Sequence, residues 1–432
     1  MYWEAVKECM NKEDLEQLQL EMLQSTLSRV YMNVPFYKRK FDDLGIDPDD
    51  FRSLDDLKKL PFTTKEDLRI SYPYGMFAVP MREVVRVQAS SGTTGMPTVV
   101  GYTKNDIKNW SNLVARVLTA GGVTQNDIVQ IAFDYGLFTG AFGLHYGAER
   151  IGASVIPVSS GNTRQQVKLM QDFRTTALIC TPTFALSIAE TIAEMGINVN
   201  SFSLKYGLFG AEPWSEAVRQ ELQEKLKIVA TDNYGLSEVM GPGVAGECIE
   251  RNGLHINEDH FIVEVVDPET LESVPDGKTG ELVITTLTKE AFPVIRFRTR
   301  DLTRIIPGPC SCGRTFARIG KVMGRTDDMI KVKGANVFPS QIEAVLCEIE
   351  GTAPHFQIVI DRKGAVDELT VLVEVSESIF FDQMKQQREF IDLIKIRLAD
   401  ELGVTVEVKL VDKKSLERFE GKTKRVIERR SL

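Results

Sequence analysis

The chain has 432 residues, of which 43% are hydrophobic and 26% are charged, and its formal net charge is −9. This length predicts two or three domains with a sizeable core, and the composition is that of an ordinary globular protein. The acidic balance argues against nucleic acid as a partner, because such binding depends on a basic face. No segment approaches the ~20 apolar residues of a membrane span, and the charged N-terminus predicts amphipathic helices instead of a signal peptide. We therefore expect a cytoplasmic protein with no membrane partner.

The first distinctive stretches lie between residues 60 and 102. Residues 60–68, LPFTTKEDL, predict a turn and then a helix that Thr64 caps before an acidic first turn. Two short strands, 84–87 and 98–102, are predicted on either side of the loop SSGTTG at 90–95. The small residues, hydroxyls and N–H groups of this loop suit an anion such as phosphate. A Walker phosphate loop would open a helix, whereas this one continues into a strand. That interpretation is therefore rejected, and a polar hairpin without a ligand is the alternative.

Helices and short apolar strands alternate from about residue 104 to residue 230, which predicts a largely parallel sheet. The predicted helices are 104–120, 140–151, 164–173, 182–195 and 216–225, and the strands are 127–132, 154–157, 177–180 and 206–209. Residues 254–306 change to β character, with strands at 261–266 and 280–285. The last hundred residues predict strands 330–332, 356–360, 369–375 and 405–410 and helices 340–347 and 383–402.

The predicted fold class is therefore α/β, with a large N-terminal domain of several subdomains that combines α/β and β parts. We assign residues 1–324 to this domain and residues 330–432 to a small α+β C-terminal domain. No low-complexity linker separates the two, so the boundary should be a compact hinge at residues 325–329.

Five further motifs decide how the SSGTTG loop is interpreted. In chain order they are GAEP at 210–213, DNYGLSE at 232–238, FRTRDLT at 297–303, GRTDDMIK at 324–331 and FEGK at 419–422. Loop and motifs together resemble the adenylate-forming superfamily of acyl-CoA synthetases, peptide-synthetase adenylation domains and luciferases. Four more stretches are similar to the phenylacetate–CoA ligase family: LPFTTK at 60–65, YGLFTG at 135–140, EDHF at 258–261 and GANVFPS at 334–340. The resemblance covers nearly the whole chain.

The resemblance implies an enzyme that joins an aryl acid, with phenylacetate as the leading candidate, to coenzyme A. ATP with Mg²⁺ would convert the carboxylate to an acyl-adenylate and release pyrophosphate, after which the thiol would displace AMP. The family also suggests a homodimer. Two alternatives stay open: an adenylating enzyme that passes its acyl group to another acceptor, such as a carrier protein, and a catalytically inactive nucleotide-binding regulator.

The resemblance also implies roles for individual residues. Lys422 would be catalytic, bridging the substrate carboxylate and the α-phosphate, and Glu238 would hold Mg²⁺ on the phosphate oxygens. The nucleotide-binding residues would be Ser90, Ser91, Gly92, Thr93, Thr94, Gly95, Gly210, Ala211, Glu212, Asp232, Tyr234, Gly235, Ser237, Asp301 and Arg325. Among these, Tyr234 would offer a flat face to adenine and Asp301 would accept the ribose hydroxyls. Met96 stands where family members often carry lysine. Taken singly, each motif has an ordinary structural alternative as a capped turn or a surface ion pair.

The hinge and the coenzyme A site follow from the need for two reactions in one cleft. The resemblance implies a large rotation of the C-terminal domain about Asp327 between adenylation and thioester formation. The rotation would present Lys333, Gly334 and Ala335 to the pantetheine arm, and glycine at 334 would let the backbone pass close to it.

The acyl pocket is predicted where aromatic and very small residues are mixed, at residues 134–143. Tyr135, Gly136, Phe138 and Phe142, together with Ala211, could hold an aromatic acid between rings. A tightly packed helix N-terminus is the structural alternative. Asp134 is an ionisable residue beside this pocket and could indicate a substituted aryl acid.

Six cysteines are too few for a disulfide scaffold in a chain of this length. Cys310 and Cys312 lie in a turn-rich stretch, and Cys248 and His255 could complete a structural Cys₃His zinc site if the β region folds back. Reduced, solvent-facing thiols are the alternative.

Overall fold

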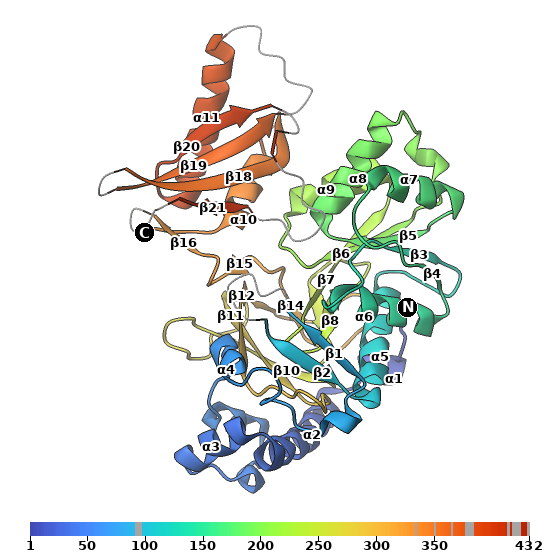
Figure 1. Cartoon of the computed structure of the whole chain (residues 1–432), viewed down its shortest axis with the longest axis vertical. Coiled ribbons are helices and arrows are strands. Elements are labelled where there is room, and N and C mark those ends of the chain that lie inside the picture. The colour runs from blue at the N-terminus through green and yellow to red at the C-terminus, as the bar shows by residue number, and fades with distance from the viewer. Residues whose placement is uncertain are drawn as a thin grey trace.

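The computed structural model describes residues 1–90, 97–332, 335–349, 351–363, 366–375, 384–412, 415–416 and 425–429. A large body holds the N-terminal three quarters of the chain, and a smaller unit with its own sheet lies at one end of it (Figure 1). This mixed architecture confirms the predicted fold class. The division at 325–329 stays a prediction.

A nine-stranded sheet with the order β13-β14-β9-β8-β7-β6-β5-β3-β4 forms the centre of the large body. Strands β3 to β7 are parallel, as the alternating pattern predicted, and the sheet becomes antiparallel from β7 onward. The strands are β3 (Ile128–Ile131), β4 (Ser154–Ile156), β5 (Ala177–Cys180), β6 (Tyr206–Gly210), β7 (Val229–Leu236), β8 (Gly241–Glu247), β9 (Leu254–Ile256), β13 (Ile305–Ile306) and β14 (Arg318–Ile319). Helix α5 (Lys104–Ala120) precedes β3, and the helices between the strands are α6 (Gly140–Ile151), α7 (Thr163–Asp172), α8 (Pro182–Glu194), the 3₁₀ turn η4 (Val199–Ser201) and α9 (Glu216–Leu226).

Helices α5 and α6 pack unusually closely because α6 has glycine where it meets α5. A Cβ atom at Gly143 would lie 2.4 Å from the ring of Trp110, and one at Gly147 would lie 2.3 Å from Val114. Trp110 is fully buried and donates its indole N–H to the Pro242 carbonyl at 2.8 Å. This contact fixes α5 and α6 against β8, the strand that follows the DNYGLSE motif.

A second sheet and a short ribbon complete the large body. The sheet has the order β10-β11-β12-β15, with β10 (Phe261–Val266), β11 (Gly280–Thr286), β12 (Phe297–Thr303) and β15 (Gly324–Arg325). The ribbon pairs β1 (Arg86–Ala89) with β2 (Val99–Tyr102) in antiparallel register, which confirms that the SSGTTG loop joins two strands.

The N-terminal elements are helical and pack beneath these sheets. They are α1 (Ala5–Glu8), α2 (Lys12–Asn33), α3 (Pro35–Leu44), α4 (Lys65–Ile70) and the 3₁₀ turns η1 (Pro48–Asp50), η2 (Leu54–Lys59) and η3 (Met81–Glu83). Across the described ranges, no helix has both the length and the apolar character that crossing a membrane requires.

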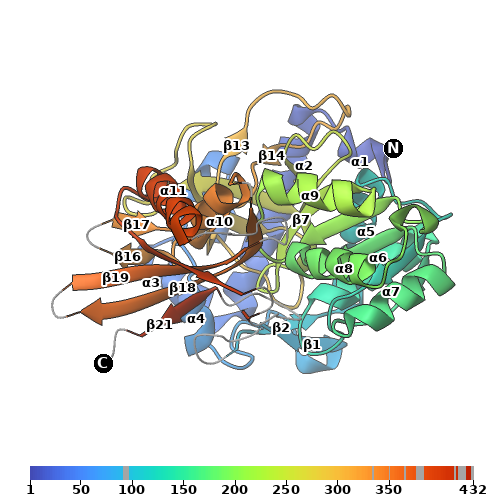
Figure 2. The same ribbon diagram turned by 90° about the horizontal axis from the view of Figure 1, so that it is seen from above.

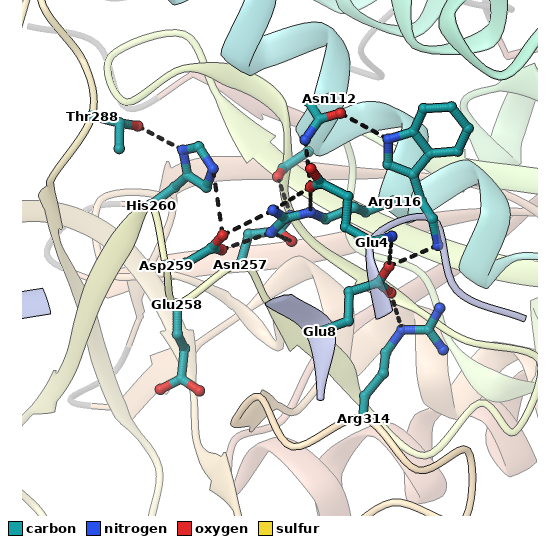
Figure 3. A network of polar contacts seen from close by, with 12 residues as sticks. Glu4, Glu8, Asn112, Arg116, Asn257, Glu258, Asp259, His260, Thr288 and Arg314 are labelled. Atoms are coloured by element: carbon teal, nitrogen blue, oxygen red, sulfur yellow. Dashed lines mark hydrogen bonds and ion pairs between the residues drawn. The ribbon is translucent and has the colours of Figure 1, made fainter. Parts of the chain in front are cut away.

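A buried polar network ties the start of the chain to the EDHF motif (Figure 3). The Arg116 guanidinium donates to both carboxylate oxygens of Asp259, at 2.6 and 2.8 Å, and to Glu4 at 2.7 Å. His260 hydrogen-bonds Thr288 at 2.6 Å, and burial lowers its pKa to about 4, so the ring is neutral. Asp259 and His260 therefore act as anchors of the fold.

The smaller unit has its own hydrophobic core and a four-stranded sheet with the order β20-β19-β18-β21. Its elements are the ribbon β16 (Ile330–Val332) and β17 (Ala335–Val337), the strands β18 (Thr352–Lys363), β19 (Val366–Val375), β20 (Glu407–Val411) and β21 (Val426–Glu428), and the helices α10 (Pro339–Cys347) and α11 (Met384–Leu402). Helix α10 lies beside α9 of the large body in both views (Figures 1 and 2).

Candidate functional site

The base of the SSGTTG loop is closed by Ser90 and Thr98. The Ser90 amide donates to the Thr98 carbonyl at 2.9 Å, and the Thr98 amide donates to the Ser90 hydroxyl at 3.1 Å. The predicted phosphate-binding residues Ser91, Gly92, Thr93, Thr94 and Gly95, and Met96 after them, lie outside the described residues.

The DNYGLSE motif forms the end of β7 and its turn into β8. A Cβ atom at Gly235 would lie 2.0 Å from the Gly241 carbonyl oxygen, so only glycine allows the two strands to approach here. This turn presents Ser237 and Glu238. The Ser237 hydroxyl is 2.8 Å from the Thr139 hydroxyl, and the nearly buried Glu238 carboxylate is 3.6 Å from the Lys65 ammonium.

Asp301 is the centre of the predicted ribose site. It lies on β12 and accepts hydrogen bonds from the Tyr234 hydroxyl at 2.5 Å and from Arg325 at 2.9 Å. Burial, and then the charge of Asp301, raise the pKa of Tyr234, so its hydroxyl keeps its proton. Burial acts to lower the pKa of Arg325, but the negative charges of Asp301 and Asp327 raise it above its usual value. The structure thus brings Tyr234, Asp301 and Arg325 together, and Tyr234 offers a donor as well as a ring.

The GAEP and DNYG residues meet at the carboxyl ends of β6 and β7. A Cβ atom at Gly210 would lie 2.3 Å from the Asn233 carbonyl oxygen, and Ala211 adopts a left-handed φ of 69°. Such strain in a non-glycine residue is found mostly at functional positions. Glu212 accepts from the Thr183 amide at 2.8 Å. Asp232 is buried, and its burial beside Glu247 raises its pKa to about 7.

Among the predicted acyl residues, Tyr135, Gly136 and Phe138 lie between β3 and α6, whereas Phe142 lies on α6 and Ala211 follows β6. The Tyr135 and Phe142 rings meet edge to face at 5.4 Å, and the position of a Cβ atom at Gly136 is open space. Phe138 is 44% exposed, which is high for a phenylalanine that only fills a core. Asp134 accepts from Ser159 at 3.1 Å and from Ser160, so its carboxylate is engaged in holding a turn.

Two residues that contact the predicted acyl residues, His145 and Arg86, were not among the site residues predicted from the sequence. The Tyr135 hydroxyl is 3.1 Å from His145 Nδ1, and His145 Nε2 is 3.1 Å from the Glu149 carboxylate. The i, i+4 spacing of His145 and Glu149 on a helix was the available signal. The Arg86 guanidinium lies 5.0 Å from the centre of the Phe142 ring.

The hinge motif forms β15 and the turn after it. Asp327 accepts two hydrogen bonds from Arg325, at 2.8 and 2.9 Å. Burial acts to raise the pKa of Asp327, but the bond to Arg325 and nearby positive charge lower it. Ala335 begins β17. The predicted coenzyme A residues Lys333 and Gly334 and the catalytic candidate Lys422 lie outside the described residues.

The predicted zinc ligands come together. Cys248 follows β8, His255 lies on β9, and the loop between β13 and β14 brings Cys310 and Cys312 to them. The four ligand atoms lie within 4.8 Å of one another, with Cys248 Sγ 3.8 Å from Cys310 Sγ and Cys312 Sγ 3.4 Å from His255 Nε2. A tetrahedron with Zn–S bonds of about 2.3 Å has edges of about 3.8 Å between sulfurs. The geometry therefore fits a closed Cys₃His metal site.

Comparison with known proteins places this geometry in a family. The AMP-binding enzyme model matches residues 44–288, and the AMP-binding enzyme C-terminal domain model matches residues 334–430. The phenylacetate–coenzyme A ligase of Escherichia coli (strain K12) is 49% identical over 422 residues, which cover 97% of this chain and 96% of the relative. The chain belongs to the phenylacetate–CoA ligase family. A ligase of this name from Thermus thermophilus is 48% identical over all of both chains.

Family membership confirms the predicted enzyme class, an AMP-forming acid–thiol ligase whose substrates include ATP, coenzyme A and a carboxylic acid. Among solved structures, 2-hydroxyisobutyryl-CoA ligase in its postadenylation state with 2-HIB-AMP superimposes with a TM-score of 0.93 at 31% identity, over 99% of this chain and 92% of that one. The same ligase with 2-HIB-AMP and CoA in the thioesterification state gives 0.73 at equal identity and coverage. Both structures are of the same ligase and match this chain with the same identity and coverage, so the difference between the two TM-scores reflects conformation. The domain arrangement of this chain is therefore closer to the postadenylation state than to the thioesterification state.

Proposed function

We propose that this chain joins phenylacetate, or a closely related aryl acid, to coenzyme A through an acyl-adenylate, with release of pyrophosphate and then AMP. The observation that carries the proposal is one hydrogen-bonded cluster of Tyr234 on β7, Asp301 on β12 and Arg325 on β15. The turn that follows β7 presents Ser237 and Glu238. A ribose acceptor and a hard carboxylate so arranged suit a nucleotide and its metal ion.

The first half-reaction brings two anions together, so the site must supply positive charge and hydrogen-bond donors. Glu238 would hold Mg²⁺, and its nearly buried carboxylate fits such a ligand. Asp301 would take the ribose hydroxyls, Tyr234 would lie against the adenine, and Ser237 would donate to the α-phosphate. Lys422 would bridge the carboxylate and the α-phosphate as they react. Gly210, Ala211 and Glu212 would line the purine edge, and residues 90–95 would hold the β- and γ-phosphates.

The second half-reaction needs a path for the pantetheine arm. Rotation about Asp327 would withdraw Lys422 and bring Lys333, Gly334 and Ala335 to the channel. Two arrangements of one homologous ligase, matched here with TM-scores of 0.93 and 0.73, support a chain built to change its domain arrangement.

The acyl group would lie near Tyr135, Gly136, Phe138, Phe142 and Ala211. The open space at Gly136 and the exposed Phe138 ring support this position. His145, held by Glu149, would fix the rotation of the Tyr135 hydroxyl at the pocket wall.

The Cys₃His cluster would hold a structural Zn²⁺, since it has four protein ligands and no open position for substrate. The bound zinc would link the β8–β9 turn to the loop between β13 and β14. Elemental analysis of the purified protein should find one zinc per chain, and a value well below one would exclude the site. A homodimer and a cytoplasmic location, where ATP, CoA and reduced thiols are present, complete the proposal.

The test is pyrophosphate release with a panel of aryl and alkyl acids, with and without CoA. Phenylacetate should give the highest kcat/KM, and AMP release should depend on free CoA. Dependence on a carrier protein instead of CoA would favour the other acceptor, and no acid-dependent exchange of pyrophosphate into ATP would favour an inactive nucleotide-binding protein.

A further inference from the structure

Lys65 of the LPFTTKED motif faces the proposed metal ligand although no role has been given to it. Its ammonium is 3.6 Å from Glu238 Oε1, while the Glu238 side chain is only 8% exposed and that of Lys65 is 32% exposed. This separation exceeds the 2.7–3.2 Å of a normal hydrogen bond, so the two charges attract each other without a fixed bond. A loosely held cation on a long side chain can move to a stronger partner at little cost.

The backbone at the base of this side chain is held firmly. The buried Thr63 hydroxyl donates to the Ile295 carbonyl at 2.6 Å, and its backbone pairs in parallel with β12 through the Arg296 carbonyl and the Arg298 amide. Thr64 and Asp67 form a capping box on the first turn of α4. Because β12 also carries Asp301, the position of Lys65 relative to the proposed ribose site is set by the fold.

The charge of Lys65 also reaches Asp327 in the predicted hinge. The pKa of Asp327, which burial would raise, is lowered by Arg325 and further by the charge of Lys65. The ammonium therefore lies within electrostatic reach of both Glu238 and Asp327. A cation there would face the triphosphate of a nucleotide whose ribose is held by Asp301.

We propose that Lys65 is a phosphate-binding residue that leaves Glu238 when the metal–nucleotide complex arrives and neutralises the ATP phosphates in the adenylation step. It would supply the positive charge that Met96 cannot supply from the phosphate loop. This inference rests on the proposed function. A lysine that only paired with Glu238 would stabilise the empty protein and would compete with the metal ion.

The test compares Lys65→Met and Lys65→Arg with the parent, and Lys58→Met serves as the control because Lys58 is exposed and pairs with the exposed Asp55 on η2. Isothermal titration calorimetry with ATP and Mg²⁺ measures binding apart from turnover. Loss of one charge-assisted hydrogen bond should weaken ATP binding by on the order of tenfold in Lys65→Met. Lys65→Arg should recover most of the affinity, and the control should match the parent.

The half-reactions and a rescue separate a phosphate role from a structural one. In Lys65→Met, pyrophosphate exchange should fall with a raised KM for ATP, whereas thioester formation from synthetic phenylacetyl-adenylate should not change, because pyrophosphate has already left. Met96→Lys added to Lys65→Met should restore part of the ATP affinity. Unchanged ATP affinity in Lys65→Met, or an equal loss in both half-reactions, would overturn the inference. If the parent shows no phenylacetate-dependent exchange, the proposed function fails, and the calorimetric comparison still decides the role of Lys65.

Discussion

The large body and the small C-terminal unit are held in the molecule in different ways. In the large body, Asp301, Tyr234 and Glu238 stand on strands or turns that belong to continuous sheets, and their backbones cannot shift without breaking buried pairs. The small unit has a separate core and touches the body through polar contacts such as His355 with Glu190 and Ser340 with the Met323 carbonyl. Cys347 adds an apolar contact, since it packs against a hydrophobic cluster of the large body. The candidate binding groups of the large body are therefore fixed, while the position of the small unit depends on contacts that can be exchanged.

The largest expected effect comes from removing Lys422, the residue that we propose the small unit delivers. Lys422→Ala should slow acyl-adenylate formation by on the order of a thousandfold, because one preorganised cation at the developing charge is lost. Thioester formation from supplied adenylate should be nearly unaffected. Rapid-quench measurement of acyl-AMP tests this, and an alanine variant as fast as the parent would disprove the role of Lys422 and the division between fixed and delivered groups.

Locking the hinge should come next. Asp327→Pro fixes φ at residue 327 and should keep part of the adenylation activity while thioester formation falls by on the order of a hundredfold. Asp327→Ala, which removes the bonds to Arg325 without fixing the backbone, is the control and should affect thioester formation less. An equal fall in both half-reactions would contradict the rotation about this residue.

The same contrast explains what the sequence could predict. The bounds of the helices and strands in residues 104–226 were predicted nearly residue by residue, because apolar strands and capped helices have signals in the local sequence. Strands β7 and β12 were not, since DNYGLSE and FRTRDLT contain glycine and charges that only the sheet context turns into strand. The candidate residues Tyr234, Asp301 and Arg325 came from motif resemblance and do lie together. Lys65 and His145 were missed because their partners Glu238 and Tyr135 are neighbours only after folding.

The fixed framework also has a pH signature. Burial raises the pKa of Asp232 to about 7, so between pH 4 and pH 7 the folded protein keeps a proton that the unfolded chain has lost. Stability should therefore fall as pH rises through this window. Asp232→Asn removes the effect, and its stability relative to the parent should increase by about 2 kcal/mol from pH 5 to pH 8. Thermal unfolding of the ligand-free proteins at both pH values measures this, with Asp172→Asn on the surface as control. A stability difference that does not depend on pH would show that Asp232 is ionised throughout.

The smallest effect should come from one exchangeable contact between the two regions. His355 Nε2 on β18 is 3.5 Å from the Glu190 carboxylate on α8, and both side chains are mostly covered. Since the pair joins the two units in the present arrangement, Glu190→Gln should weaken that arrangement without touching substrate. We expect adenylation to slow by about threefold, which corresponds to about 0.7 kcal/mol for a partly screened pair.

Glu348→Gln, which removes the Arg397 pair inside the small unit, should leave the ratio of the two half-reactions unchanged. If Glu190→Gln behaves like this control, the His355–Glu190 contact does not stabilise the present arrangement of the two units. The hydrogen bonds of Arg325 to Asp301 and Asp327 would then be the contacts to test next.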